Sequence, residues 1–346
     1  MTNNIVHCTK KFTKTVVYDV ENYGVFGGWG IAGFSASIIN VMKYFFMIGV
    51  LFAGAFFALN HQELAEIQTS SPKKEIVVVA VGDTMLGRFV EELSLRHGFD
   101  YPFASTSDIF SGADIVFANF EGAIPKVHEK TPNYNYKLSV PQESVMVTHR
   151  AGINVVSLSN NHSGDFGAEG YANTVSVLNN AGIATVGKYS DYVYEQNDMK
   201  IRFMGWNDTF THFATSTFSK SIRSSKKDGE FLIASVHFGE EYATTSNARQ
   251  KSVAHTLIDA GADVVIGTHP HVVEEMEIYH GKPIFYSLGN FIFDQYFSEE
   301  TQKGLAVKMI IKEGAVEYEM LPIDLAKSQP KLNANVAVRK FTVFRQ

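Results

Sequence analysis

Cysteine is almost absent from the 346-residue chain, and the single one, Cys8, lies near the N-terminus. The remainder of the chain therefore has no internal disulfide, no cysteine nucleophile and no thiolate ligand for a metal. A metal site in this chain must use imidazole, carboxylate and amide groups. The lack of thiolates also argues against a structural zinc site.

Runs of lysine and arginine are also missing, and the formal net charge is −6. Nucleic acid is therefore not expected as a partner. The composition, 45% hydrophobic and 19% charged, is typical of a globular protein. The length allows one large α/β domain or two smaller ones, and we predict one.

A single long hydrophobic run, residues 38–59, carries only one charge, Lys43. It is long enough to cross a bilayer, so we predict a transmembrane helix between a tail (residues 1–37) and a polar linker (residues 60–74). A cleaved signal peptide and a buried core helix are the alternatives. Lysines flank both ends of the run, and we favour the orientation with the tail inside. The expected localisation is a single-pass membrane protein with an extracytoplasmic globular domain.

Five Val/Ile-rich runs in the remaining sequence each stop at a cluster of polar side chains. Continuous apolar runs predict strands that are covered on both faces, in a mainly parallel or mixed sheet. Helical stretches at Ala168–Gly182 and Asn247–Gly261 indicate that helices alternate with strands. The five runs are Glu75–Arg88, Ser111–Gly122, Ala151–His162, Phe231–Tyr242 and Ala260–His271.

Two later segments, with turns at His280-Gly281 and Glu313-Gly314, predict β-hairpins. Their antiparallel strands would build a second sheet. We therefore predict an α/β domain, residues 75–326, made of a sandwich of two mixed β-sheets flanked by helices. Residues 327–346 contain one short strand-like run and no motif, and we predict a C-terminal extension without an assigned role.

The polar clusters lie where functional groups gather in α/β sheets, outside the carboxyl ends of the strands. We expect them to converge on one metal site. His269 and His271 are two residues apart, and Pro270 biases His269 toward an extended conformation, which would place both rings on the same side. Two surface histidines in a turn are the alternative. The predicted metal ligands are Asp83, Asn119, Glu121, Asn161, His237, His269 and His271.

Two of these ligands have structural alternatives, since His237 could be a core histidine and Asp83 could cap a helix. Asn161 can offer a neutral carbonyl oxygen to a metal, and the adjacent His162 can donate a proton to a leaving group. This mixed nitrogen and oxygen set favours Mn, Zn or Fe, as one or two ions.

Three further residues are predicted to contact substrate. Arg88 would bind an anionic group, although it could equally be a solvated helix residue. Glu241 and Asn290, from two later motifs, are assigned to substrate binding.

Six ordered motifs between Glu75 and Gln295 resemble the CapA or PgsA family of bacterial capsule synthesis proteins, which is linked to poly-γ-glutamate. They are GDTMLGR, NFEG, LSNNHSGDFG, VHFGEEY, GTHPH and YSLGNFIFDQ. The resemblance implies a calcineurin-like metallophosphoesterase fold and attachment to a membrane. It also implies a polymer-synthesis complex with an amide ligase and a small membrane subunit.

The resemblance assigns the predicted ligands to phosphoesterase motifs. These are the Asn-His pair (Asn161-His162), the lone histidine (His237), the closing H-x-H (His269 and His271) and the bridging aspartate, replaced by Asn119 or Glu121. One departure stands out. The phosphoesterase opening is Asp-x-His, whereas Asp83-Thr84-Met85 has a thioether, a poor ligand for hard metals, in place of the first imidazole.

Two functions follow as hypotheses. In the first, the site binds metal or an anionic polymer, and the protein acts in a membrane complex that makes or exports poly-γ-glutamate or a similar polymer. In the second, a divalent metal activates water or polarises an ester or amide, as in a cell-surface phosphatase or nuclease.

Overall fold

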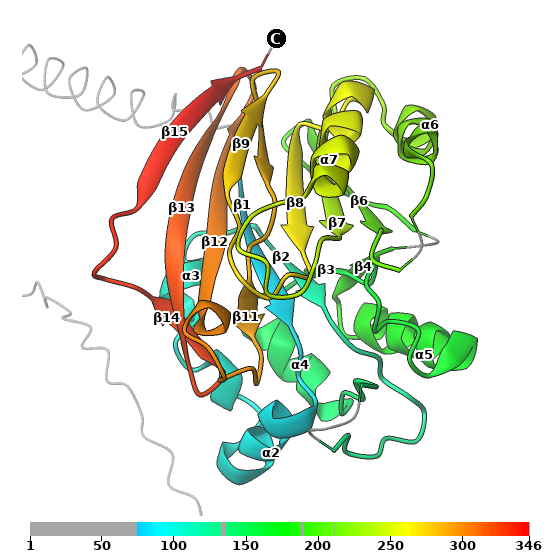
Figure 1. Cartoon of the computed structure of the whole chain (residues 1–346), viewed down its shortest axis with the longest axis vertical. Coiled ribbons are helices and arrows are strands. Elements are labelled where there is room, and N and C mark those ends of the chain that lie inside the picture. Colours follow the sequence, from blue (N-terminus) through cyan, green and yellow to red (C-terminus); the bar gives the residue numbers. More distant parts are fainter. Residues whose placement is uncertain (1–74, 133–135, 188–189, 211, 346) are drawn as a thin grey trace, which may run out of the picture. The chain divides into compact units, whose positions relative to one another are not determined.

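The computed structural model describes residues 75–132, 136–187, 190–210 and 212–345. The predicted tail, transmembrane helix and linker lie outside these residues. Among the helices of the described part, none is long and apolar enough to span a bilayer. The described strands form two mixed sheets, and helices cover them (Figure 1).

The first sheet has the strand order β14-β13-β12-β1-β2-β3-β4, with β11 pairing to β1 and β15 to β13. Its strands are β1 (Glu75–Thr84), β2 (Ile115–Phe120), β3 (Val155–Ser157), β4 (Ala184–Val186), β11 (Asn290–Ile292), β12 (Lys303–Lys312), β13 (Ala315–Ala326), β14 (Gln329–Leu332) and β15 (Arg339–Phe344). Strands β1 to β4 run parallel, and β12 is antiparallel to β1.

The second sheet has the order β5-β6-β7-β8-β10-β9. Its strands are β5 (Tyr192–Gln196), β6 (Met199–Asn207), β7 (Phe231–His237), β8 (Val264–Thr268), β9 (Met276–Tyr279) and β10 (Lys282–Phe285). The helices are α2 (Arg88–His97), α3 (Ser107–Phe110), α4 (Glu143–Arg150), α5 (Gly167–Asn180), α6 (Thr215–Ser225) and α7 (Ala248–Ala260), with short 3-10 turns at Tyr101–Phe103 and Glu300–Gln302.

Three hydrophobic clusters hold these layers together. One packs α2 to α5 on the outer face of the first sheet, one lies between the two sheets, and one packs α6 and α7 on the outer face of the second. Alternation along β1 shows how one strand serves two clusters, since Val79 and Val81 face the helices while Val78 and Ala80 face the other sheet. This confirms the predicted sandwich of two mixed sheets flanked by helices.

Most predicted elements are present. The five Val/Ile-rich runs form β1, β2, β3, β7 and β8, and the two helical stretches form α5 and α7. Helix α7 begins with a capping box between Asn247 and Gln250, and Gly261 follows its last residue with φ 120°. The predicted hairpins are β9–β10 and β12–β13. They do not build the second sheet together, as predicted, because β12–β13 lies beside β1 in the first sheet and only β9–β10 belongs to the second.

The boundary at residue 326 is wrong. Strands β14 and β15 both pair with β13, so the residues predicted as an extension belong to the first sheet. The connection from β13 to β14 is a tight turn at Lys327-Ser328, and both residues have positive φ, 51° and 62°. Turns of this kind usually contain Asn and Gly, so Lys-Ser carries no turn signal.

Candidate metal centre

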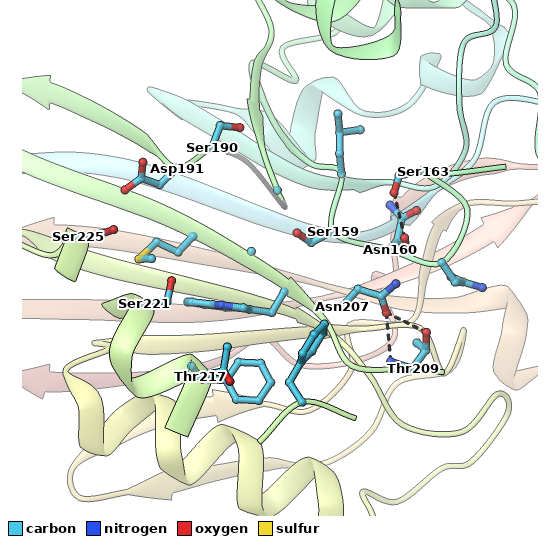
Figure 2. Close-up of a pocket in the computed structure, with 18 of the residues that line it drawn as sticks. Ser159, Asn160, Ser163, Ser190, Asp191, Asn207, Thr209, Thr217, Ser221 and Ser225 are labelled. Atoms are coloured by element: carbon cyan, nitrogen blue, oxygen red, sulfur yellow. Dashed lines mark hydrogen bonds between the residues drawn. The ribbon is translucent and has the colours of Figure 1, made fainter. Parts of the chain in front are cut away.

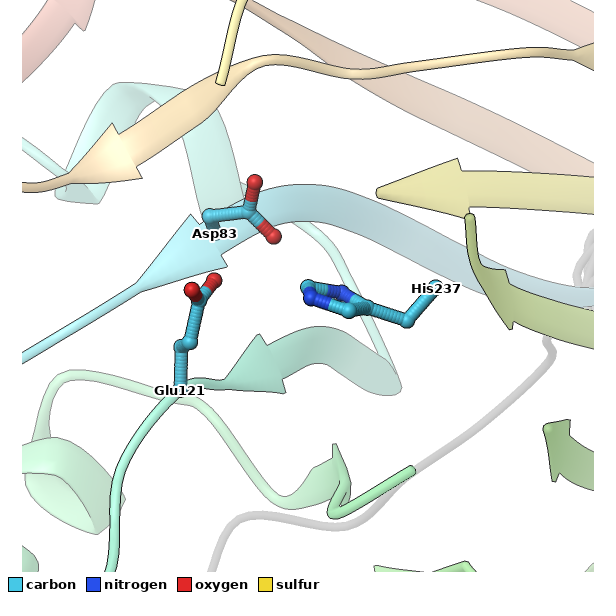
Figure 3. A group of neighbouring side chains, drawn as sticks. All are labelled: Asp83, Glu121 and His237. Atoms are coloured by element: carbon cyan, nitrogen blue, oxygen red, sulfur yellow. The ribbon is translucent and has the colours of Figure 1, made fainter. Parts of the chain in front are cut away.

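The ends of β1, β2, β7 and β8 meet at one edge of the two sheets and bring the predicted ligands together. Figure 3 shows the side chains of Asp83, Glu121 and His237 pointing toward one another. One ligand atom from each lies within 4.8 Å of the others, and all three residues are buried. These three residues come from strand ends far apart in the sequence, as expected for a site built at the carboxyl edge of parallel strands.

Asp83 reaches this site because β1 changes neighbour near its end. The strand pairs with β12 up to Ala80 and with β11 from Asp83 onward. Between them, Gly82 lies so close to the backbone that an added Cβ would be 1.9 Å from the carbonyl oxygen of Gly289. Only glycine permits this approach, which fixes where Asp83 leaves the strand.

Asn119 holds the carboxylates in place. Its amide nitrogen lies 2.8 Å from Asp83 Oδ1 and 3.2 Å from Glu121 Oε2. Its carbonyl oxygen accepts a hydrogen bond from Asn160 Nδ2, at 3.0 Å. This arrangement differs from the predicted role of Asn119 as a ligand, because the atom that could bind a metal is turned toward Asn160.

Glu121 is the most unusual group in the site. It is fully buried, and its Oε1 atom has no hydrogen-bond partner among the described residues. Burial, and next the charge of Asp83, raise the pKa of Glu121 well above its usual value. The nearest basic atoms to Oε1 are His271 Nε2 at 3.7 Å and His162 Nε2 at 3.9 Å.

The three predicted histidine ligands cluster beside these carboxylates. The rings of His237 and His269 are 4.7 Å apart between centroids, and those of His269 and His271 are 6.1 Å apart. His237 Nε2 lies 2.8 Å from Asn161 Oδ1, and its Nδ1 lies 2.9 Å from Thr268 Oγ1. Two of the predicted ligands, Asn161 and His237, are therefore in direct contact with each other.

The environment separates the pKa values of these histidines. Burial, followed by the neighbouring imidazoles, lowers the pKa of His237 well below its usual value and that of His269 to about 4. Burial also acts to lower the pKa of His271, but Glu121 and Asp83 outweigh it and raise that pKa to about 9.

The conformation predicted for the H-x-H segment is wrong. His269 and His271 have φ of 102° and 61°, so the segment turns instead of remaining extended. The His269 N–H donates to Asp83 Oδ2 at 3.2 Å, and the Pro270 carbonyl accepts from the N–H of Tyr242 at 2.7 Å. These contacts hold the backbone in a region that side-chain-bearing residues seldom adopt, which is common at functional sites.

His162 lies at the rim of the site, with its side chain 19% exposed. Its Nδ1 is 2.9 Å from Asp165 Oδ2, which leaves Nε2 directed toward Glu121. Asp165 was not predicted, although it lies only three residues after His162 in the same motif. A carboxylate in this position fixes the tautomer and orientation of an imidazole.

The residues predicted to contact substrate are placed differently. Arg88 is ion-paired with Asp294, and its Nε donates to Asp294 Oδ2 at 3.2 Å. Asn290 is fully buried; its Oδ1 lies 3.0 Å from His271 Nδ1, and both N–H groups meet protein oxygens, so it positions His271. Glu241 is exposed, and its charge acts on the pKa values of Glu121 and His271.

A cavity of about 700 Å³ opens beside the site (Figure 2). Hydroxyl and amide groups line much of it, together with the aromatic rings of Trp206, Phe210 and Phe213. Asn161 lines this cavity and also contacts His237, so a molecule in the cavity would lie against the predicted ligands. The motifs predicted only one side of this cavity, the loop after β3 that carries LSNNHSGDFG, because the rest of the lining comes from β6, α6 and the loops after β4 and β6.

The group fits a divalent metal ion. Glu121 Oε1 and His269 Nδ1 are both buried without a partner, and a cation would satisfy each of them. Asp83, Glu121 and His237, whose ligand atoms lie within 4.8 Å of one another, form a mixed nitrogen and oxygen set of the kind that Zn, Mn and Fe accept, and His269, His271 and Asn161 lie beside them. Met85 is not one of these possible metal ligands. Its side chain is fully buried in the cluster under α2 to α5, and its sulfur accepts from the N–H of Gly87 at 3.1 Å.

Comparisons with known proteins agree on one family. Residues 77–295 match the profile of the bacterial capsule synthesis protein PGA_cap. The chain is 30% identical to the capsule biosynthesis protein CapA of Bacillus anthracis over 87% of this chain and 79% of that protein. It is 31% identical to the PGA biosynthesis protein CapA of Bacillus subtilis, over 77% of this chain and 76% of that one.

A hypothetical protein from Thermus thermophilus is one of the solved structures that are similar to the chain. It has 18% sequence identity and a TM-score of 0.45, over 78% of this chain and all of the other. A similarity this low supports no statement about function.

Proposed function

We propose, because this chain belongs to the family of bacterial capsule synthesis proteins, that it acts in the synthesis or export of a capsular polymer such as poly-γ-glutamate through a divalent metal site. The metal ligands in this proposal are Asp83, Glu121, Asn161, His237, His269 and His271, and Asn119 holds the two carboxylates. The bound ion is Mn, Zn or Fe, present as one or two ions.

The observation that carries the metal site is the buried Oε1 atom of Glu121, which has no partner. A carboxylate oxygen is costly to bury alone, and Asp83 adds a second acidic group beside it. A divalent ion offsets both costs. When bound, it would supply a Lewis acid for hydrolysis of an amide bond of the polymer, the reaction by which the site would trim or release a chain during synthesis or export.

Three other residues have roles in proton transfer and substrate binding in this proposal. His162, oriented by Asp165 at Nδ1, directs Nε2 toward the site, from which the ring in its doubly protonated form can donate to a leaving amine or alkoxide. Asn161 faces both the site and the 700 Å³ cavity, so it can contact substrate and ion together. Arg88 can bind an anionic group of the polymer only by sharing its charge with Asp294.

Membrane attachment is part of the proposal. In it, residues 38–59 anchor the chain, the described domain faces outward, and an amide ligase and a small membrane subunit complete the polymer-synthesis complex. The genes next to this one provide a direct check. If they encode neither an amide ligase nor a small membrane protein, the polymer is a different one.

The first experiment measures metal and turnover in the same sample. Full-length protein in detergent is analysed for bound metal by mass spectrometry and then incubated with poly-γ-glutamate and Mn²⁺, with chain length followed by gel filtration. We expect close to one or two bound ions and shortening of the polymer. Glu121→Gln should remove both, whereas Glu169→Gln, at an exposed ion pair with Lys126, should change neither. Protein that stays metal-free at every loading contradicts the metal site.

A cell-surface phosphoesterase is the second candidate, and the His162–Asp165 pair favours it because cleavage of a phosphate ester needs a proton donor for the leaving alkoxide. It predicts turnover of a generic phosphodiester with Mn²⁺ that His269→Ala abolishes. Lack of turnover with every metal, in protein that binds metal, rejects this candidate and leaves the capsule function standing.

A further inference from the structure

A second cavity, of about 660 Å³, lies at the opposite end of the second sheet and has no part in the proposed metal site. It is lined by the end of α6 and the loop after it, the start of β7, the turn between β9 and β10, and parts of β13 and β15. Phe231 lines it, and His237, six residues along the same strand, belongs to the metal site. At about 3.3 Å per residue the two sites are roughly 20 Å apart. We call it the basic cavity.

Positive charge dominates this lining. Five lysine and arginine side chains stand against three carboxylates, of Asp228, Glu230 and Asp263. Glu230 already accepts hydrogen bonds from Nε and Nη2 of Arg202, a residue outside the lining. Asp263 is shared by two of the lysines, Lys226 and Lys282.

Three cations of the basic cavity, Arg223, Lys227 and Arg345, have no ion pair with a carboxylate of the described residues. Asp228 is the one carboxylate of the lining that remains against these three. The guanidinium of Arg345 lies over the ring of Phe231, 5.4 Å from its centroid. Its planar face is therefore packed, while its N–H groups are available to an acceptor with two oxygens.

An unpaired hydroxyl lies at the same place. Tyr318 is 1% exposed and lines the cavity, and its hydroxyl has no hydrogen-bond partner in the described part of the chain. Burial raises the pKa of this phenol, so the hydroxyl keeps its proton and can donate. A buried donor without an acceptor is unfavourable, and an oxygen atom of a ligand would satisfy it.

We propose that the basic cavity binds an oxyanion, a carboxylate or a phosphate, between Arg223, Lys227 and Arg345, with the Tyr318 hydroxyl donating to it. Because the metal site is farther away than the roughly 8 Å Debye length of physiological salt, the two sites bind independently. A polymer with a carboxylate on each residue would thus be held at a point remote from the bond that reacts.

The test uses the full-length protein in detergent, stripped of metal with EDTA and then dialysed free of the chelator, so that neither the metal site nor the carboxylates of EDTA contribute. Binding of three probes is measured by calorimetry: a γ-glutamate oligomer of about ten residues, glutarate and inorganic phosphate. The variants are Arg223→Gln/Lys227→Gln, on exposed positions, and Tyr318→Phe, which removes only the hydroxyl. The control, Arg96→Gln/Lys126→Gln, changes the net charge equally at exposed sites elsewhere.

We expect the oligomer to bind, with affinity reduced about tenfold by the double variant and by Tyr318→Phe, and within twofold of wild type in the control. Tyr318→Phe should melt no lower than wild type, because its hydroxyl has no partner to lose. If phosphate binds and the carboxylates do not, with the same variants affected, the site is a phosphate site. Binding that the variants leave unchanged, or no binding of any probe, overturns the proposal.

Discussion

His162 and Asp165 are joined through Nδ1 and Oδ2 at 2.9 Å, and this contact turns the other ring nitrogen of His162 toward the buried carboxylate of Glu121. Asp165 Oδ2 also accepts from the N–H of Leu138 at 2.7 Å, so the carboxylate is itself fixed. The geometry is that of an oriented proton donor at the rim of a metal site.

Asp165→Asn should therefore slow turnover by about 10–100-fold without loss of metal, because the amide can keep the Leu138 contact but no longer matches the charge of a protonated imidazole. Asp165→Glu should recover part of the rate. Metal content and turnover are measured on the same samples. Asp108→Asn, at an exposed position, serves as the control. A rate that is unchanged in Asp165→Asn removes His162 from the mechanism.

Glu121→Gln should separate metal binding from folding. Metal at about a thousand times its dissociation constant stabilises wild-type protein by about 4 kcal/mol, roughly 10 °C in melting temperature. The variant should lose this gain, because it loses an anionic ligand. Without metal it should melt at or above the wild-type temperature, because no carboxylate remains buried beside Asp83. Calorimetric scans with and without Mn²⁺ test this, and an equal metal-dependent rise in both proteins contradicts it.

Met85→His should not add a metal ligand, although phosphoesterase motifs have a histidine at this position. The Met85 side chain is fully buried in the cluster between the first sheet and its helices. We expect a loss of about 2–4 kcal/mol in the free energy of unfolding, from burial of a polar ring in an apolar cluster, and no additional bound metal. Denaturant unfolding and metal analysis measure both. A gain of one metal ion per chain is the result that would count against this placement.

Glu274 should make stability depend on pH. It is 6% exposed, one carboxylate oxygen has no partner, and burial raises its pKa to about 7 despite a hydrogen bond from Gln250. The folded protein therefore holds a proton that the unfolded chain releases near pH 4.5. The contribution of Glu274 to the free energy of unfolding is fully present below about pH 4.5 and is lost as pH rises through about 7.

Glu274→Gln should remove that loss, which amounts to about 2–3 kcal/mol between about pH 4.5 and 8. The Gln side-chain oxygen can still accept from Gln250, so the fold should be kept. Denaturant unfolding across this pH range compares the two proteins. Parallel curves for wild type and variant would show that Glu274 is not the source.

Much of the site could be predicted because strand ends are visible in the sequence. The apolar runs of β1, β2 and β7 predicted where Asp83, Glu121 and His237 would gather. The strands at the far edge of the first sheet, β14 and β15, could not be predicted from the sequence. The Lys327-Ser328 turn before β14 lacks the usual turn residues, and β15 has only exposed and partly exposed positions, with no buried residue.

Individual side-chain roles were harder to predict than positions. The orientation of the Asn119 amide is set by Asn160, a residue 41 positions away, and the turn at His269 is set by its contact with Asp83. Such contacts depend on tertiary structure, and local patterns contain no information about them. Nor could composition reveal Tyr318 as a buried donor without an acceptor.

The position of β1 affects how the chain can fold. β1, the first strand of the described domain, lies in the middle of its sheet, where it pairs with β2 soon after it and with β12 near the other end of the domain. Until β12 has been synthesised, β1 has an open edge at the centre of the future sheet, and closing it requires a contact of long sequence separation. The nascent chain should therefore need protection from aggregation until most of the domain has emerged, and a truncation that removes β12 should yield insoluble protein rather than a smaller folded domain.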